Sequence, residues 1–313
     1  MDIVRLITSV IYAYFIISYV FGINYIWVDI VLYTVLLISV VYATEVNMAL
    51  SNARIWYNVI VVSVAMSIPQ TVFAVNLAHG GKPVAAWIDT LGSTLVDAVL
   101  VTALVRRHVV GAHLTTSPLV VSYMVFWSIL AVGLNITAWH PELYNSKYVA
   151  LFYTAAGLLL PIMLVRGNVG GLPSRGDVLM LANNAFATLI ASYMLSEAVA
   201  QLNIEEIQLG VTSVILATLP DFLVGMVIRG VAARILSSEA GDKEMVYTML
   251  AAATHDQLTI PGLIMLFVPM AMAYYPHLFN IVVVVLKFTL LDRRAYWFVG
   301  VPAAILTLLM PPV

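Results

Sequence analysis

The sequence predicts an all-α polytopic membrane protein with about eleven transmembrane helices, arranged as one extra N-terminal helix and two inverted five-helix repeats. Three observations predict this class. Of the 313 residues, 62% are hydrophobic and only 10% are charged, whereas soluble domains carry about 25% charged residues. Apolar runs recur along the whole chain, and two of them repeat one local pattern. The composition therefore excludes a soluble enzyme with a single anchor.

Apolar runs of the length needed to cross a bilayer, about 20 residues each, follow one another along the chain. Polar residues, glycine and proline mark the breaks between them. The first run has no basic leading segment and no small-residue cleavage site, so it is expected to stay as a helix. The predicted spans are residues 3–21, 25–50, 54–78, 84–106, 115–139, 147–165, 177–202, 206–230, 244–268, 270–291 and 295–311.

Basic residues fall almost entirely on one side of this predicted bundle. When successive spans alternate in direction, all of the 14 Lys and Arg residues except Lys82 and Lys147 lie on the side of the N-terminus. Cytoplasmic loops carry the excess of Lys and Arg in membrane proteins. The N-terminus is therefore predicted to be cytoplasmic, and the C-terminus to lie outside.

The repeated pattern is a glutamate followed, about one helical hairpin later, by a small hydroxyl residue, an aliphatic residue, proline and an amide or acid. The first copy starts at Glu45 and ends at Ser67-Ile68-Pro69-Gln70, and the second starts at Glu197 and ends at Thr218-Leu219-Pro220-Asp221. Five spans separate the copies, so they enter the membrane from opposite sides. The predicted division is the extra helix at 1–22, a first five-helix repeat at 24–166 and a second, inverted repeat at 176–313.

Four polar residues are expected near the middle of the membrane, namely Gln70, Asp97, Asp221 and Asp256. A carboxyl group at that depth costs at least ~2.5–3.5 kcal/mol. Three aspartates on three helices therefore favour an ion site near the midplane. The alternative is that each aspartate is a protonated or hydrogen-bonded packing group.

Proline adds free backbone oxygens to the same region. Pro69 and Pro220 have no N–H, so each leaves a carbonyl one turn earlier without its helical donor, next to the carbonyls of Met66 and Ala217. Hard cations prefer carboxylate, carbonyl and hydroxyl oxygens. A partly dehydrated cation would satisfy these groups, although a simple helix kink satisfied by nearby hydroxyls is the alternative.

The fourth predicted span carries Asp89, Ser93 and Asp97 at helical spacing, which places them on one stripe. This stripe fits one wall of an ion path, or a helix face packed against other polar helices. In the ninth span, His255 and Asp256 point about 100° apart on an α-helix, so only one can face the centre. Asp256 is the predicted ligand, with His255 as a neighbouring hydrogen-bonding group or a proton-coupling residue.

Glu45 and Glu197 occupy matching positions in the two copies of the repeated pattern. They could line ion access or pair with polar neighbours. The chain contains no cysteine, so thiolate metal sites and disulfides are absent. No P-loop, no HExxH pattern and no basic nucleic-acid footprint is present, so no cofactor, nucleotide or nucleic-acid partner is expected.

These motifs resemble the calcium/cation antiporter superfamily, which includes Na⁺/Ca²⁺ and H⁺/Ca²⁺ exchangers. In that family each half carries a G-T-S-x-P-E signature and a later G-S-N-x-x-D/N segment. Ala65-Met66-Ser67-Ile68-Pro69-Gln70 and Leu216-Ala217-Thr218-Leu219-Pro220-Asp221 resemble the first signature, and Leu91-Gly92-Ser93-Thr94-Leu95-Val96-Asp97 resembles the second. Thr254-His255-Asp256-Gln257-Leu258-Thr259 corresponds to the second signature by position.

The resemblance implies exchange of a cation, Ca²⁺ by family default, for Na⁺ or H⁺ by alternating access. The implied ligands are the side chains of Ser67, Gln70, Thr94, Asp97, Thr218, Asp221 and Asp256, with Asp97, Asp221 and Asp256 as the acidic metal ligands. The family's paired glutamates are here Gln70 and Asp221, which removes one charge from the expected site. Small inorganic cations and the lipid bilayer are then the partners.

Two other functions fit parts of the pattern. Paired membrane aspartates can act as acid and base in an intramembrane aspartyl protease, but the chain has no GxGD signature. A cation channel or a sensor on the exchanger fold is the other alternative, because Gln70 departs from the family's glutamate. The chain is otherwise expected not to be an enzyme.

Overall fold

The computed structural model describes residues 2–22, 25–49, 63–107, 118–165, 174–235, 247–248 and 250–291. Side chains are described in a smaller set, which leaves out those of 2–8, 43–49, 98–107, 177, 221–235 and 286–291. Every regular element in this part of the chain is a helix. The predicted all-α class is therefore confirmed. The predicted span 295–311 lies outside the described residues, as does the start of 54–78.

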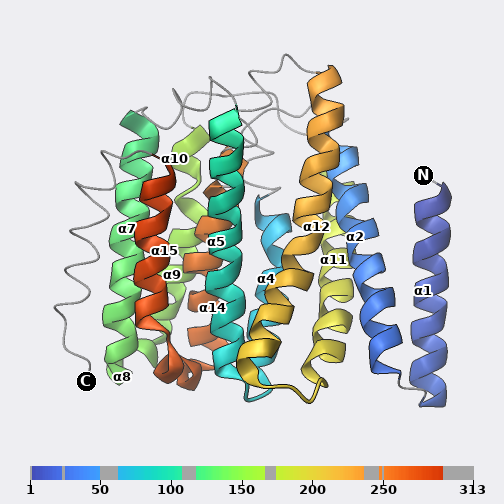
Figure 1. Ribbon diagram of the computed structural model, residues 1–313, viewed down its shortest axis with the longest axis horizontal. Helices are drawn as coiled ribbons and strands as arrows, with labels where there is room; N and C mark the ends of the chain where they lie inside the picture. The colour runs from blue at the N-terminus through green and yellow to red at the C-terminus, as the bar shows by residue number, and fades with distance from the viewer. Residues whose placement is uncertain are drawn as a thin grey trace.

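The helices stand side by side in one bundle, with α1 (Asp2–Phe21) at one end of the long axis and α7 (Pro118–Trp139) towards the other (Figure 1). The remaining long helices of the first half are α2 (Ile26–Ala49), α4 (Ser63–His79), α5 (Pro83–Arg107) and α9 (Lys147–Leu159). Those of the second half are α11 (Arg175–Ala200), α12 (Glu206–Ile235), α14 (Ile260–Phe267) and α15 (His277–Leu291). Helix α1 packs against α2, where the Tyr14 hydroxyl donates to Asp29 Oδ1 at 2.9 Å.

The described helices include three that are long and apolar enough to cross a membrane, at Pro118–Trp139, Lys147–Val165 and Val178–Ala200. Their outward faces carry large apolar side chains. Phe126, Ile129, Tyr148, Phe186 and Leu189 are all exposed, and such a surface fits contact with lipid. The chain is an integral membrane protein, and the orientation of its termini stays a prediction.

The two halves of the chain interleave rather than forming separate lobes. Helix α2 packs against α11 and α12, α4 packs against α11 and α14, and α5 packs against α12 and α15. The boundaries of the two predicted repeats, 24–166 and 176–313, stay predictions. The packing between halves nevertheless matters for function, because elements from both halves meet in the interior.

Glycine permits the close contact between α5 and α12. A Cβ on Gly92 of α5 would lie 2.6 Å from Val214 Cγ2 of α12, and one on Gly210 would lie 2.7 Å from Ile88 Cβ. Real Cβ atoms do not approach other atoms this closely, so only glycine lets α5 and α12 pack at this distance. The close packing brings the polar stripe of α5 next to the second half of the chain.

Short turns join the helices at one end of the bundle. Between α4 and α5, Gly81 adopts φ +74°, a conformation that glycine reaches at little cost. Lys82 Nζ then donates to the carbonyl of Ala200 at 2.5 Å, and the Val84 N–H donates to Glu206 Oε2 at 3.0 Å. These bonds attach the α4–α5 turn to the α11–α12 turn.

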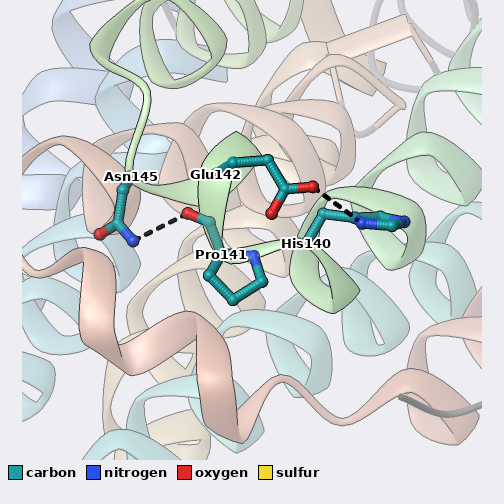
Figure 2. Close-up of polar contacts among 4 residues, drawn as sticks. All are labelled: His140, Pro141, Glu142 and Asn145. Carbon is teal, nitrogen blue, oxygen red and sulfur yellow. Dashed lines mark hydrogen bonds and ion pairs between the residues drawn. The ribbon is translucent and has the colours of Figure 1, made fainter.

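The connection from α7 to α9 contains the short helix α8 (Pro141–Tyr144). Figure 2 shows its polar contacts: His140 Nδ1 lies 3.0 Å from Glu142 Oε1, and Asn145 Nδ2 donates to the Pro141 carbonyl at 2.8 Å. Helix α9 ends at Leu159, and the short α10 (Ile162–Val165) follows Pro161. The predicted span 147–165 is thus helical with a break, because Pro161 cannot donate to the ladder.

The predicted span 270–291 is wrong at its start. Residues Pro269–Tyr274 form a 3₁₀ helix, η3, and the α-helix α15 begins only at His277. Pro269 and Pro276 explain the difference, because each lacks an N–H and proline disfavours helical geometry in the residue before it. Trp87 Nε1 of α5 donates to the carbonyl of Ala271 in η3 at 2.8 Å, and its ring packs edge-to-face on Tyr275.

Candidate functional site

Helix α5 carries the predicted polar stripe into the interior. Asp89 and Ser93 are fully buried, and Asp97 is 2% exposed. The hydroxyls of the neighbouring Thr90 and Thr94 donate to carbonyls of their own helix at 2.8 and 2.9 Å. An α-helix satisfies threonine hydroxyls in this way at low cost, whereas carboxylates need partners from other elements.

Helix α4 supplies the first copy of the repeated motif. Ser67 and Gln70 are both buried, and Pro69 lies inside the helix between them. Ser67 Oγ donates to the carbonyl of Ala252 at 3.4 Å, which joins α4 to the segment just before Asp256. Met66, whose carbonyl is a predicted ligand, is buried one residue before Ser67 on the same helix.

Helix α12 supplies the second copy. Ala217 and Thr218 are buried, and Pro220 lies inside the helix. The Thr218 hydroxyl donates to the carbonyl of Val214 at 2.6 Å. The backbone of Asp221 is part of α12, but its side chain lies outside the described residues, as does that of Glu45 in α2.

Asp256 lies in a π-helical turn, η2 (His255–Thr259), which leads into α14. In this turn the N–H of Ile260 donates to the carbonyl of His255, five residues earlier. Pro261 follows directly and cannot donate, which accounts for the local change of hydrogen-bonding pattern. Single π-turns occur frequently at functional sites, and Asp256 is fully buried in this one.

His255 is also buried, and it bonds to two hydroxyl groups. Its Nε2 lies 3.1 Å from Ser63 Oγ of α4, and its Nδ1 lies 3.5 Å from Thr259 Oγ1. The imidazole therefore acts as a hydrogen-bonding bridge between η2 and α4, one of the two roles expected from the sequence.

The structure brings most of the predicted site residues onto four neighbouring elements. Helices α4 and α5 pack against each other, and each of them packs against both α12 and η2. The predicted side chains on these elements whose placement is described are Ser67, Gln70, Asp89, Ser93, Thr94, Asp97, Thr218, His255 and Asp256. Glu197 lies apart on α11, where it is only half-buried.

Within the described part of the chain, no three His, Asp or Glu side chains gather closely enough to hold a metal ion. The described side chains leave out that of Asp221, and the predicted ligand set contains amide, hydroxyl and carbonyl oxygens besides carboxylates. That mixture of ligands is the usual one for hard cations.

A second polar cluster lies beside η2 and was not predicted. Gln257 Nε2 donates to Asn280 Oδ1 of α15 at 2.6 Å, and Asn280 Nδ2 lies 3.2 Å from Asn135 Oδ1 of α7. Asn280 Nδ2 also donates to the carbonyl of Ala131 at 2.9 Å, and all three amide side chains are fully buried. Single asparagines inside the apolar spans 115–139 and 270–291 are the signal that would have indicated this cluster.

No family model and no curated protein matches the sequence. The arrangement of the helices instead matches the fold of a solved transporter structure. That structure is the crystal structure of the H⁺/Ca²⁺ exchanger CAX, which this chain resembles with a TM-score of 0.60 and 14% sequence identity. The match covers 99% of this chain and 88% of the exchanger.

Proposed function

We propose that this protein is a secondary active cation antiporter, which exchanges a cation for Na⁺ or H⁺ by alternating access. One observation carries the proposal: on an exchanger fold, α4 and α5 carry buried polar side chains and pack against both α12 and the π-turn η2, in which Asp256 is buried. Buried carboxyl groups inside a membrane bundle typically mark ion or proton pathways. A transporter also fits the absence of any nucleotide motif in the sequence.

The proposed ligands come from both halves of the chain. Asp97, Asp221 and Asp256 supply the acidic oxygens, and the remaining oxygens come from Ser67, Gln70, Thr94, Thr218 and the carbonyls of Met66 and Ala217. Movement of the proline-containing helices α4 and α12 relative to the other helices would then open the site to one side at a time. A ligand set divided between moving elements couples ion binding to this change of access.

Ca²⁺ is the first cation to test, because the structural neighbour exchanges H⁺ for Ca²⁺ by its description. This chain has Gln70 where the exchanger family has a glutamate. A site with fewer anionic ligands binds Ca²⁺ more weakly. We therefore expect either weak Ca²⁺ transport or a preference for a cation of lower charge.

The test is uptake of Ca²⁺, Mg²⁺, Mn²⁺, Na⁺ and K⁺ into proteoliposomes with an outward gradient of H⁺ or Na⁺. Exchange predicts uptake of one cation that stops when the opposing gradient is removed. Uptake that continues without any counter-ion would contradict exchange and support a channel. No flux of any cation through folded protein would overturn the transporter proposal.

A further inference from the structure

Asp89 is a buried acidic residue that lies outside the proposed set of cation ligands. Its side chain is fully buried on α5, and neither carboxyl oxygen has a hydrogen-bond partner among the described residues. Ser93 Oγ, one turn further along the same stripe, is likewise buried without a partner among them. An ionised carboxylate without hydrogen bonds or a counter-charge is costly in such a place, whereas the neutral acid is tolerated.

Among the described residues, no counter-charge bonds to Asp89. The elements packed against α5 include α4, α12, α15, η2 and η3. Their titratable side chains, within the described set and leaving out the exposed Tyr274, are His79, Glu206, His255, Asp256 and His277. Tyr275, between η3 and α15, packs on Trp87 of α5. None of these forms a hydrogen bond to Asp89. A metal cation would need several more oxygen ligands than one carboxyl and one hydroxyl, whereas a proton needs only the carboxyl.

We propose that Asp89 is the proton-binding carboxyl of the exchange cycle and that it is separate from the cation ligands Asp97 and Asp256. This inference rests on the proposed antiport and names H⁺ as its counter-ion. The step is a protonation equilibrium: one O–H bond forms on the Asp89 carboxylate when a proton arrives and breaks when it leaves.

The spacing along α5 explains how the two ions would oppose each other. Asp89 and Asp97 are eight residues apart, which is about 12 Å along a helix. A cation held at Asp97 favours the ionised form of Asp89, so cation binding weakens proton binding. At that distance inside a protein, one unit charge changes the other binding constant by about tenfold. Ser93 lies midway between the two aspartates on the same stripe.

The experiment compares two fluxes in the same proteoliposomes. H⁺-driven cation uptake requires the proton site, whereas self-exchange of a labelled cation requires only the cation site. In Asp89→Asn we expect H⁺-driven uptake to fall at least about tenfold and self-exchange to stay within about twofold of wild type. Asp29→Asn is the matched control, because Asp29 bonds to Tyr14 away from the stripe, and both of its fluxes should match wild type.

Equal loss of both fluxes in Asp89→Asn, or H⁺-driven uptake that persists, would overturn the inference. Exchange driven by Na⁺ with no proton movement would also overturn it. If Asp89→Asn does not fold, Asp89→Ser removes the carboxyl without adding volume.

Infrared spectroscopy gives a readout independent of transport: the C=O band of a protonated carboxylic acid should be weaker in Asp89→Asn than in Asp29→Asn. An unchanged band would overturn the inference even if the antiport itself is established, whereas absence of all flux in wild type would count against the antiport.

Discussion

The imidazole Nε2 of His255 lies 3.1 Å from the hydroxyl oxygen of Ser63, and this contact joins the π-helical turn η2 to α4. Both residues are buried, at 2% and 0% exposure. The contact spans the two halves of the chain and lies one residue from Asp256. The position of that aspartate relative to the α4 motif therefore depends in part on this polar bridge, together with the bond from Ser67 to the Ala252 carbonyl.

Replacement of Ser63 tests this bridge. Ser63→Ala removes the partner of a buried ring nitrogen, so we expect a loss of about 0.5–1.5 kcal/mol of stability. The measurement is thermal unfolding of the purified protein in detergent. Ser39→Ala is the matched control, because its hydroxyl only donates to Val35 of its own helix. Equal melting temperatures for the two variants would contradict a structural role for the bridge.

The amide cluster beside η2 makes a second prediction. Asn280→Leu would leave Gln257 and Asn135 buried without their shared partner, at a cost of about 1–3 kcal/mol. Asn145→Leu is the matched control, because Asn145 is exposed and bonds only within its own turn (Figure 2). A melting temperature of Asn280→Leu at or above that of the control would show that the cluster does not stabilise η2.

The close approach of α5 to α12 makes a third prediction. A Cβ at Gly210 would lie 2.7 Å from Ile88 Cβ and 3.0 Å from the Ala85 carbonyl oxygen. Because a backbone oxygen cannot move aside cheaply, Gly210→Ala should cost about 1–3 kcal/mol and separate the two helices. In the control Gly176→Ala, the nearest atom lies 3.6 Å away. The measurement is the unfolding temperature of each variant. A Gly210→Ala variant as stable as the control would refute the packing argument.

A fourth prediction concerns the charge of residue 70 in the α4 motif. Gln70→Glu would add a carboxylate to the proposed cation site, and about 1.4 kcal/mol of added attraction corresponds to a tenfold gain in affinity. We expect at least that gain in the concentration dependence of Ca²⁺ uptake. Gln208→Glu, at an exposed position of α12, should change nothing. Unchanged or weaker Ca²⁺ dependence in Gln70→Glu would place Gln70 outside the cation site.

The fold class was predictable because apolar periodicity and length are strong signals in a membrane chain. Most described helices begin and end within a few residues of the predicted spans, as α2 does at Ile26–Ala49 against 25–50. The exception is η3, where two prolines divide the apolar run 270–291 between a 3₁₀ helix and an α-helix. Hydropathy does not register such a break, since the run is apolar throughout.

The burial of most candidate site residues was predictable and their connections less so, while their role in binding a cation stays a prediction. The stripe on α5 and the motif on α4 followed from helical spacing, and both lie in the interior. Asp256 was placed on a regular helix, whereas the structure shows a π-turn, whose different residue spacing changes which side chains share a face. The bridge from Ser63 to His255 joins residues 192 positions apart, and no local pattern can indicate such a contact.

The central claim is that the protein is a cation exchanger whose cation site includes Asp256 of η2. Transport by a matched pair of aspartate variants tests this claim most directly. The measurement is gradient-driven cation uptake into proteoliposomes by wild type, Asp256→Asn and Asp29→Asn, each shown to be folded by its melting temperature. An exchanger with its cation site at η2 predicts uptake by wild type and Asp29→Asn, and a loss of at least about a hundredfold in Asp256→Asn, as expected when a buried charged ligand is removed. Uptake by Asp256→Asn at the rate of the control would contradict the account.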